Sequence, residues 1–155
     1  MFSILEMFKI GVGPSSSHTV GPMVAACKFV ESLEHAGTLG RVSRVRTVLY
    51  GSLALTGLGH GTDRATVAGL EGNMPQTVDT DHVNIIRHEC ESSGELLLAG
   101  KHRIDFDYAH DVAMDVWHRL AAHPNGMRFQ AFDQQNNLVD EQVWYSICLL
   151  YTSDA

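Results

Sequence analysis

Gly13-Pro14-Ser15-Ser16-Ser17-His18-Thr19 runs directly into the stretch Val20 to His35, and this junction decides the first part of the fold. Glycine, proline and serine predict a loop over residues 11–19. Apolar residues recur on one face of the following stretch, which predicts a helix over about residues 20–35, with Pro22 in its first turn. Thr19 or the serines before it can cap this helix. Gly37 ends it, because glycine accepts the left-handed conformation at helix ends.

Shorter elements are predicted on both sides of this junction. They are a short helical turn over residues 3–9 with Phe8 and Ile10 packed inward, a strand over residues 42–53, and helices over about residues 64–70 and 82–92. A second glycine-rich loop over residues 57–63 precedes the middle helix, which Thr62 or Asp63 caps. Asp79 or Asp81 caps the last one.

The second half of the chain is predicted to form mainly strands. They are expected at about residues 96–98, 103–106, 127–132 and 139–147, with a hairpin turn at residues 134–137. Helices and strands mix without regular βαβ alternation. The sequence therefore predicts an α+β domain with a mixed, largely antiparallel sheet that carries helices.

Composition restricts the class of protein. The chain has 155 residues, 45% of them apolar, and a formal net charge of −7. This predicts one folded domain and argues against nucleic acid or an anionic membrane as its partner. The start lacks the features of a signal peptide, and no stretch approaches the roughly 18 apolar residues of a membrane span, so we expect a cytoplasmic protein. Cys27, Cys90 and Cys148 form no Cys-x-x-Cys pair, which favours reduced, packed thiols over a disulfide framework or a metal site.

Three loops combine glycine with polar or titrating side chains. In residues 13–19, hydroxyls and amides beside a helix N-terminus suit a carboxylate or phosphate, and His18 could move a proton. In residues 57–63, glycines surround His60, without the pattern of a phosphate-binding or dinucleotide loop. His123-Pro124-Asn125-Gly126 is typical of a tight turn, or of a small binding loop. A plain cap or turn explains each loop equally well from residue types alone.

The long run from Phe8 to Met23 resembles the opening of bacterial iron–sulfur-dependent L-serine dehydratases. Further segments match that family in order along the chain: Tyr50–Gly57, Gly59–Asp63, Gly72–Asp79, Asn125–Met127 and Val143–Ile147. The resemblance covers residues 3–147. It implies a beta domain over residues 1–147. Residues 148–155 depart from the family pattern and are expected to be a truncated or artefactual tail.

The resemblance implies a carbon–nitrogen lyase that converts L-serine to pyruvate and ammonia without pyridoxal phosphate. A [4Fe–4S] cluster would sit on a second, C-terminal (alpha) domain or subunit and act there as Lewis acid. No cysteine of this chain matches the cluster ligands, so the chain itself would bind no metal and be inactive alone. The fold would resemble the allosteric substrate-binding domain of some phosphoglycerate dehydrogenases. The expected partners are L-serine, the companion domain and further copies of the protein in a homo-oligomer.

The resemblance also assigns roles to residues. Catalytic roles fall to His60, Thr62 and His18, substrate binding to Ser15, Ser16, Ser17 and Thr19, and a regulatory serine site to His123, Asn125 and Gly126. Asp63 would cap and orient. Two other functions remain open: a non-catalytic amino-acid-binding regulatory module that uses the His123 loop, and a phosphate-handling enzyme that uses the serine-rich loop.

Overall fold

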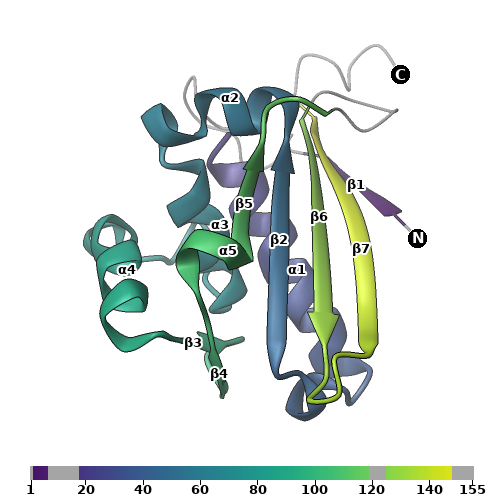
Figure 1. Ribbon diagram of the computed structural model, residues 1–155. Helices are drawn as coiled ribbons and strands as arrows, with labels where there is room; N and C mark the ends of the chain where they lie inside the picture. The colour runs from purple at the N-terminus through teal and green to yellow at the C-terminus, as the bar shows by residue number, and fades with distance from the viewer. Residues whose placement is uncertain (1, 7–17, 119–124, 148–155) are drawn as a thin grey trace.

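A five-stranded mixed sheet forms the centre of the computed structural model, which describes residues 2–6, 18–118 and 125–147 (Figure 1). Its strand order is β1-β7-β6-β2-β5. The strands are β1 (Phe2–Glu6), β7 (Leu138–Ile147), β6 (Gly126–Phe132), β2 (Arg44–Tyr50) and β5 (Val112–Asp115). The two inner pairings, β7 with β6 and β6 with β2, are antiparallel, and the two outer pairings are parallel. The predicted α+β class is confirmed.

The helix α1 (Val20–His35) spans the predicted residues and packs along one face of this sheet. Its Phe29 ring stacks on Phe129 of β6, with the ring centroids 5.2 Å apart. Gly37 follows the helix with a φ of 73°, in the left-handed conformation that was predicted. The Thr19 side chain makes no capping hydrogen bond to the helix, so that part of the prediction is wrong. The Thr19 carbonyl instead accepts the Met23 amide at 3.1 Å.

The helix α3 (Thr62–Leu70) lies against α1 at a point where the two backbones nearly touch. A methyl group added at Gly69 would overlap the Met23 carbonyl oxygen and would lie 2.8 Å from the Ala26 side chain. Only glycine permits this approach. The contact fixes the last turn of α3 against the first turns of α1.

Two predictions are wrong in the region between Tyr50 and Gly61. They are the end of the strand expected over residues 42–53 and most of the loop expected over residues 57–63. The strand β2 ends at Tyr50, and the chain then forms helix α2 (Gly51–His60). Leu53 and Gly57, one helical turn apart, are both buried, so these residues follow a helical period. The helix α2 packs at Gly57 on Met114 of β5, where an added Cβ atom would displace the Met114 methyl group. Only Gly61, with a φ of 71°, breaks the helix.

The helical turn predicted over residues 3–9 is also wrong where the structure describes it. Residues 2–6 form β1, which pairs in parallel with β7 from Phe2 opposite Val143 to Glu6 opposite Ile147. A neighbouring strand satisfies the backbone of such a short segment better than one isolated helical turn does. Phe8 and Ile10 lie outside the described residues.

The remaining elements complete the layer beside the sheet. They are the 3-10 turn η1 (Leu39–Arg41), α4 (Thr80–Ser93), α5 (Tyr108–Asp111) and a separate hairpin of β3 (Glu95–Leu98) and β4 (His102–Asp105). Asp79 caps α4 by accepting the Asp81 amide at 2.9 Å, as predicted. The β6–β7 hairpin turn is confirmed, while α5 and β5 were not predicted. Within the described part of the chain, no helix is both long enough and apolar enough to span a membrane.

Replacing Gly69 by alanine should force α1 and α3 apart. We expect the free energy of unfolding to fall by about 1–3 kcal/mol, because overpacking outweighs the roughly 1 kcal/mol by which alanine favours a helix over glycine. Urea unfolding measures this. Gly40→Ala is the matched control, since an added Cβ at Gly40 meets nothing within 4 Å. A Gly69→Ala variant as stable as the parent would contradict the close contact.

Candidate functional site

A pocket of about 250 Å³ lies where α1 and α3 begin. Thr19 enters it from the end of the serine-rich stretch, Gly61 from the second glycine-rich segment, and Arg64 from the first turn of α3. The other lining residues come from α1, α3, α4 and the segment before α4: Val20, Met23, Ala65, Pro75, Val78, Thr80, Val83 and Asn84. Two motifs that are far apart in the sequence therefore meet at one pocket.

Three consecutive residues in the first turn of α3, of which Arg64 lines this pocket, carry buried polar atoms without partners. Thr62 is fully buried and Asp63 is 4% exposed. Thr62 Oγ1, Asp63 Oδ1 and Arg64 Nε have no hydrogen-bond partner among the described residues. An unsatisfied buried group costs about 1–3 kcal/mol, so such groups are usually explained by function or by a bound molecule.

The predicted cap of α3 is wrong, and this explains why these groups are unpaired. The N-cap residue is Gly61, and no side chain caps the helix there. Thr62 and Asp63 are already inside the first turn, so their side chains point away from the amides that a cap would satisfy. The Thr66 hydroxyl, one turn later, donates to the Thr62 carbonyl at 2.7 Å. The backbone and the surrounding packing therefore hold Thr62 and Asp63 in this turn. Thr62 Oγ1 and Asp63 Oδ1 are left without a hydrogen-bond partner among the described residues.

The other oxygen of Asp63 is held from two distant elements. The Tyr108 hydroxyl of α5 donates to Oδ2 at 2.7 Å. Arg87 Nη1 of α4 lies 4.0 Å from the same oxygen, and the Arg87 guanidinium sits 5.1 Å from the centroid of the Tyr108 ring. Burial, and then the hydrogen bond to Asp63, raises the pKa of Tyr108. The phenol therefore stays protonated and acts as the donor.

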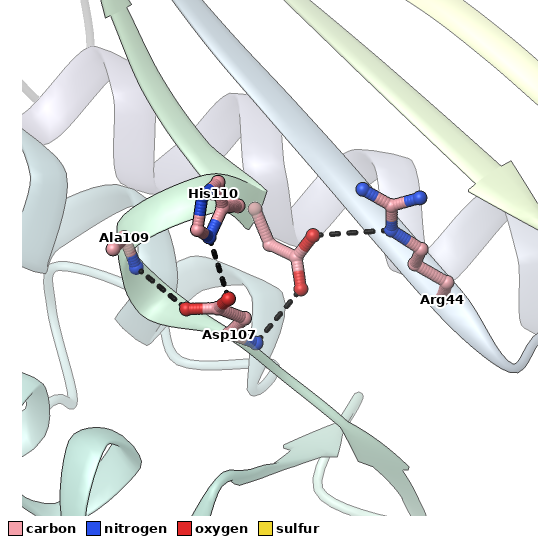
Figure 2. Close-up of polar contacts among 5 residues, drawn as sticks. Arg44, Asp107, Ala109 and His110 are labelled. Atoms are coloured by element: carbon pink, nitrogen blue, oxygen red, sulfur yellow. Dashed lines mark hydrogen bonds and ion pairs between the residues drawn. The ribbon is translucent and has the colours of Figure 1, made fainter.

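A second set of hydrogen bonds fixes α5, and with it Tyr108 (Figure 2). Asp107 caps α5 by accepting the Ala109 amide at 3.2 Å, and its other oxygen lies 2.6 Å from His110 Nδ1. The hydrogen bond with His110 is the main cause that lowers the pKa of Asp107. Asp111, which is 4% exposed, accepts the Asp107 amide at 2.8 Å and Arg44 Nε of β2 at 3.1 Å. Nothing in the sequence indicates the pair between Asp111 and Arg44, because these residues lie on distant elements.

The structure describes only some of the histidines and serines that were predicted to be functional. His60 is the last residue of α2, directly before Gly61, but its side chain lies outside what the structure describes. His18 is half-buried and precedes Thr19 at the start of α1. Ser15, Ser16, Ser17 and His123 lie outside the described residues. The roles assigned to these residues remain predictions.

Asn125 and Gly126, predicted to be regulatory, lie at the opposite end of α2 from His60. The Ser52 hydroxyl, in the first turn of α2, donates to Asn125 Oδ1. Asn125 Nδ2 donates to the Ser146 carbonyl at 3.2 Å, and the Ser146 amide donates to the Asn125 carbonyl at 2.9 Å. Gly126 begins β6 opposite Tyr145. Asn125 therefore ties the start of α2 to the end of β7.

The described residues do not fit as ligands of an iron–sulfur cluster. They contain no group of three or more His, Cys, Asp or Glu residues that could hold a metal ion. Burial, with Glu31 as the next cause, raises the pKa of Cys27 to about 11. Burial, with Glu71 as the next cause, raises that of Cys90 to about 12. Both thiols are therefore packed as protonated side chains, and neither belongs to a group of possible metal ligands among the described residues.

The helix α4 forms one wall of the pocket and is tied to α3 by an ion pair. His82 Nε2 lies 2.7 Å from Glu71 Oε1, directly after the end of α3, and His82 Nδ1 lies 3.6 Å from Glu89. The hydrogen bond with Glu71 is the main cause that raises the pKa of His82 above 6.5. The folded state therefore favours the protonated imidazole.

This pair predicts a pH-dependent contribution to stability. Because the folded pKa of His82 is raised, the stabilisation is fully present below about pH 6.5 and is lost as the pH rises through the raised value. We expect a contribution below about 1 kcal/mol, since the imidazole is partly exposed. Urea unfolding of the parent and of His82→Gln across this pH range measures it. Glu71→Gln should remove the same pH-dependent component, and a component that survives in both variants would exclude this pair as its source.

Comparison with known proteins places the chain among relatives of one kind. The family described as "Serine dehydratase beta chain" matches residues 3–148. An L-serine dehydratase of Helicobacter pylori is 45% identical over 146 residues, which are 94% of this chain and 31% of that protein. L-serine dehydratase 1 of Escherichia coli is 45% identical over 148 residues, 95% of this chain and 32% of that protein. An L-serine dehydratase of Streptomyces coelicolor is 43% identical over 145 residues, with coverages of 94% and 32%. The chain thus spans about a third of the length of these relatives.

Proposed function

The chain belongs to the serine dehydratase beta chain family, and from this we propose that it forms one wall of the active site of an L-serine dehydratase. The other wall belongs to a companion alpha part, as a domain or a subunit. The observation that carries this proposal is the run of unpartnered buried atoms on Thr62, Asp63 and Arg64 in the first turn of α3, the turn that contributes Arg64 to the pocket that Thr19 also lines. A site of this kind is unfinished without a polar ligand or a second surface.

The pocket has the polarity expected for the carboxylate of an amino acid. Arg64 is the only charged residue among the described residues that line it. The helices α1 and α3 both begin there, and helix N-termini favour negative charge. Hydroxyls and amides of Ser15, Ser16, Ser17 and Thr19 would bind the substrate from the α1 side.

The proposed reaction removes water and then ammonia from L-serine. Loss of the Cα proton and of the Cβ hydroxyl group yields aminoacrylate, which tautomerises to an imine that water hydrolyses to pyruvate and ammonia. His60 handles a proton, as a histidine can near neutral pH, while His18 and Thr62 line the same cleft and hold the substrate. The family resemblance also implies a [4Fe–4S] cluster on the companion part. The described residues do not fit as its ligands, so the companion part would hold it.

A regulatory serine site is a second proposal, at His123, Asn125 and Gly126. The hydrogen bond between Asn125 and Ser52 supports it, because it links this loop to α2, the helix that ends at His60. Without the companion part, the same loop would make the chain an amino-acid-binding module with no turnover.

The proposed activity requires both walls of the site. We expect the complete protein, with its companion part, to produce pyruvate from L-serine, and the isolated chain to produce none. His60→Ala should lower kcat by about 100-fold or more without unfolding the protein, because a proton-transfer group is lost. A coupled pyruvate assay and circular dichroism measure these two effects. Turnover by the chain alone, or a near-normal kcat in the variant, would contradict the assignment.

The unpartnered hydroxyl of Thr62 should serve function at the expense of stability. In the complete protein we expect Thr62→Val to lower kcat by about tenfold or more. Its free energy of unfolding should stay constant or rise by about 1 kcal/mol, because a buried unsatisfied group is removed. Thr66→Val is the matched control: its hydroxyl is already bonded, so stability should fall while kcat changes little. The opposite pattern would make Thr62 a structural residue.

Calorimetric titration of the chain with L-serine tests the regulatory site. We expect His123→Ala to weaken binding by about tenfold or more, since a charged or polar contact to a small ligand contributes about 1.5–3 kcal/mol. His110→Ala is a suitable control, because this histidine is exposed and contacts Asp107. Equal affinities of the parent and of His123→Ala would exclude the site.

A further inference from the structure

We infer that Tyr108 is a positioning residue for the proposed reaction, and that it acts through Asp63. Its hydroxyl holds one oxygen of the Asp63 carboxylate and leaves the other available at the start of α3. The inference rests on the proposed function, and it adds a residue from a segment that contributes nothing to the pocket lining.

The two oxygens of Asp63 are in different surroundings. Oδ2 receives the Tyr108 hydroxyl at 2.7 Å and has Arg87 Nη1 at 4.0 Å, whereas Oδ1 has no partner among the described residues. A carboxylate that served only to join α3 to α5 would use both oxygens, since each unsatisfied one is unfavourable in a buried site. One anchored oxygen and one unpaired oxygen instead orient the group, so that Oδ1 keeps its capacity to accept a hydrogen bond.

Tyr108 is itself held rigidly. It is 5% exposed, and its ring meets Phe106 edge-on with the centroids 6.1 Å apart. The hydrogen bonds of Asp111 to Arg44 and to the Asp107 amide fix α5 against β2, independently of Asp63 (Figure 2). The hydroxyl is therefore a pre-placed donor, and α5 does not depend on Asp63 for its own position.

The Tyr108 hydroxyl can affect the proposed site because of where Asp63 lies. Asp63 lies in the first turn of α3, between Thr62 and Arg64, whose polar atoms are also unpaired. Fixing its carboxylate fixes the turn that these neighbours share. Small displacements of groups in an active site can lower a rate by as much as about 100-fold, so a single supporting hydroxyl has a measurable effect.

A double-mutant cycle in the complete protein tests this inference. Tyr108→Phe keeps the ring and removes only the hydroxyl. We expect it to lower kcat for L-serine by about tenfold, with KM within about twofold, because Tyr108 does not touch the substrate. In an Asp63→Asn background the same change should have less than about a twofold effect, because residues that act through one another are not additive. Tyr50→Phe is the matched control: its hydroxyl accepts Arg128 Nε at 3.2 Å, and Arg128 retains Glu141.

Arg87→Gln is a second test of the role of the Asp63 carboxylate. Arg87 approaches Oδ2 from a side chain that is 46% exposed, so its replacement does not endanger folding. We expect a smaller fall in kcat, about twofold to threefold, again with little change in KM, because the contact is longer. Thermal unfolding of every variant separates loss of fold from loss of rate.

Each outcome of these experiments either supports or overturns the inference. A tenfold fall in kcat that disappears in the Asp63→Asn background supports the inference. If Asp63→Asn alone has no activity, the combination of lower kcat and constant KM in both Tyr108→Phe and Arg87→Gln supports it. An active parent whose kcat is unchanged in Tyr108→Phe, or falls equally in both backgrounds, overturns the positioning role alone. A complete protein that forms no pyruvate from L-serine overturns the proposed function, and the positioning role with it.

Discussion

The contact between α1 and α3 at Gly69 is the constraint on which the candidate site depends. Gly69 meets the backbone of Met23, so no side chain can separate the two helices at that point. The two helices run side by side from there, and Thr19 and Gly61, which directly precede them, line one pocket together with Arg64. Each helix is preceded by a segment rich in glycine or serine.

The interior beside that pocket is less well satisfied than the rest of the core. Thr62 is fully buried, and neither its hydroxyl nor Asp63 Oδ1 has a partner among the described residues. Asp111, by contrast, is paired with Arg44 and with the Asp107 amide. Of the four unsatisfied buried side-chain atoms among the described residues, three lie at the start of α3 and the fourth is Thr47 Oγ1 on β2. This clustering agrees with the expectation that local exceptions to good packing lie at functional sites.

Sequence reasoning predicted what local patterns determine and missed what distant contacts determine. The helix α1 and the β6–β7 hairpin were predicted because their apolar periods and turn residues lie within the segments themselves. Gly57 was read as part of a loop, whereas it permits α2 to pack on Met114, a residue that no local pattern brings near. The same holds at the site: the two segments that contribute Thr19 and Gly61 were singled out from the sequence, but the second was wrongly expected to be a loop. Tyr108 and Arg87 reach Asp63 from other elements, and nothing in their own surroundings in the sequence signals it.

The helix α2 connects the two regions to which the proposals refer. Its first turn is tied to Asn125 through Ser52, its middle packs on Met114 of β5, and its last residue, His60, precedes the left-handed Gly61 that begins α3. A helix fixed at its start and in its middle moves as one body, so a shift at Asn125 would be delivered to His60 rather than absorbed along the way. In the proposed regulation, a serine bound at Asn125 would act on α2 through Ser52 and on β7 through Ser146. Of these two contacts, the one with Ser52 leads along α2 to His60, so Ser52 is the residue at which the proposed regulation would be coupled to catalysis.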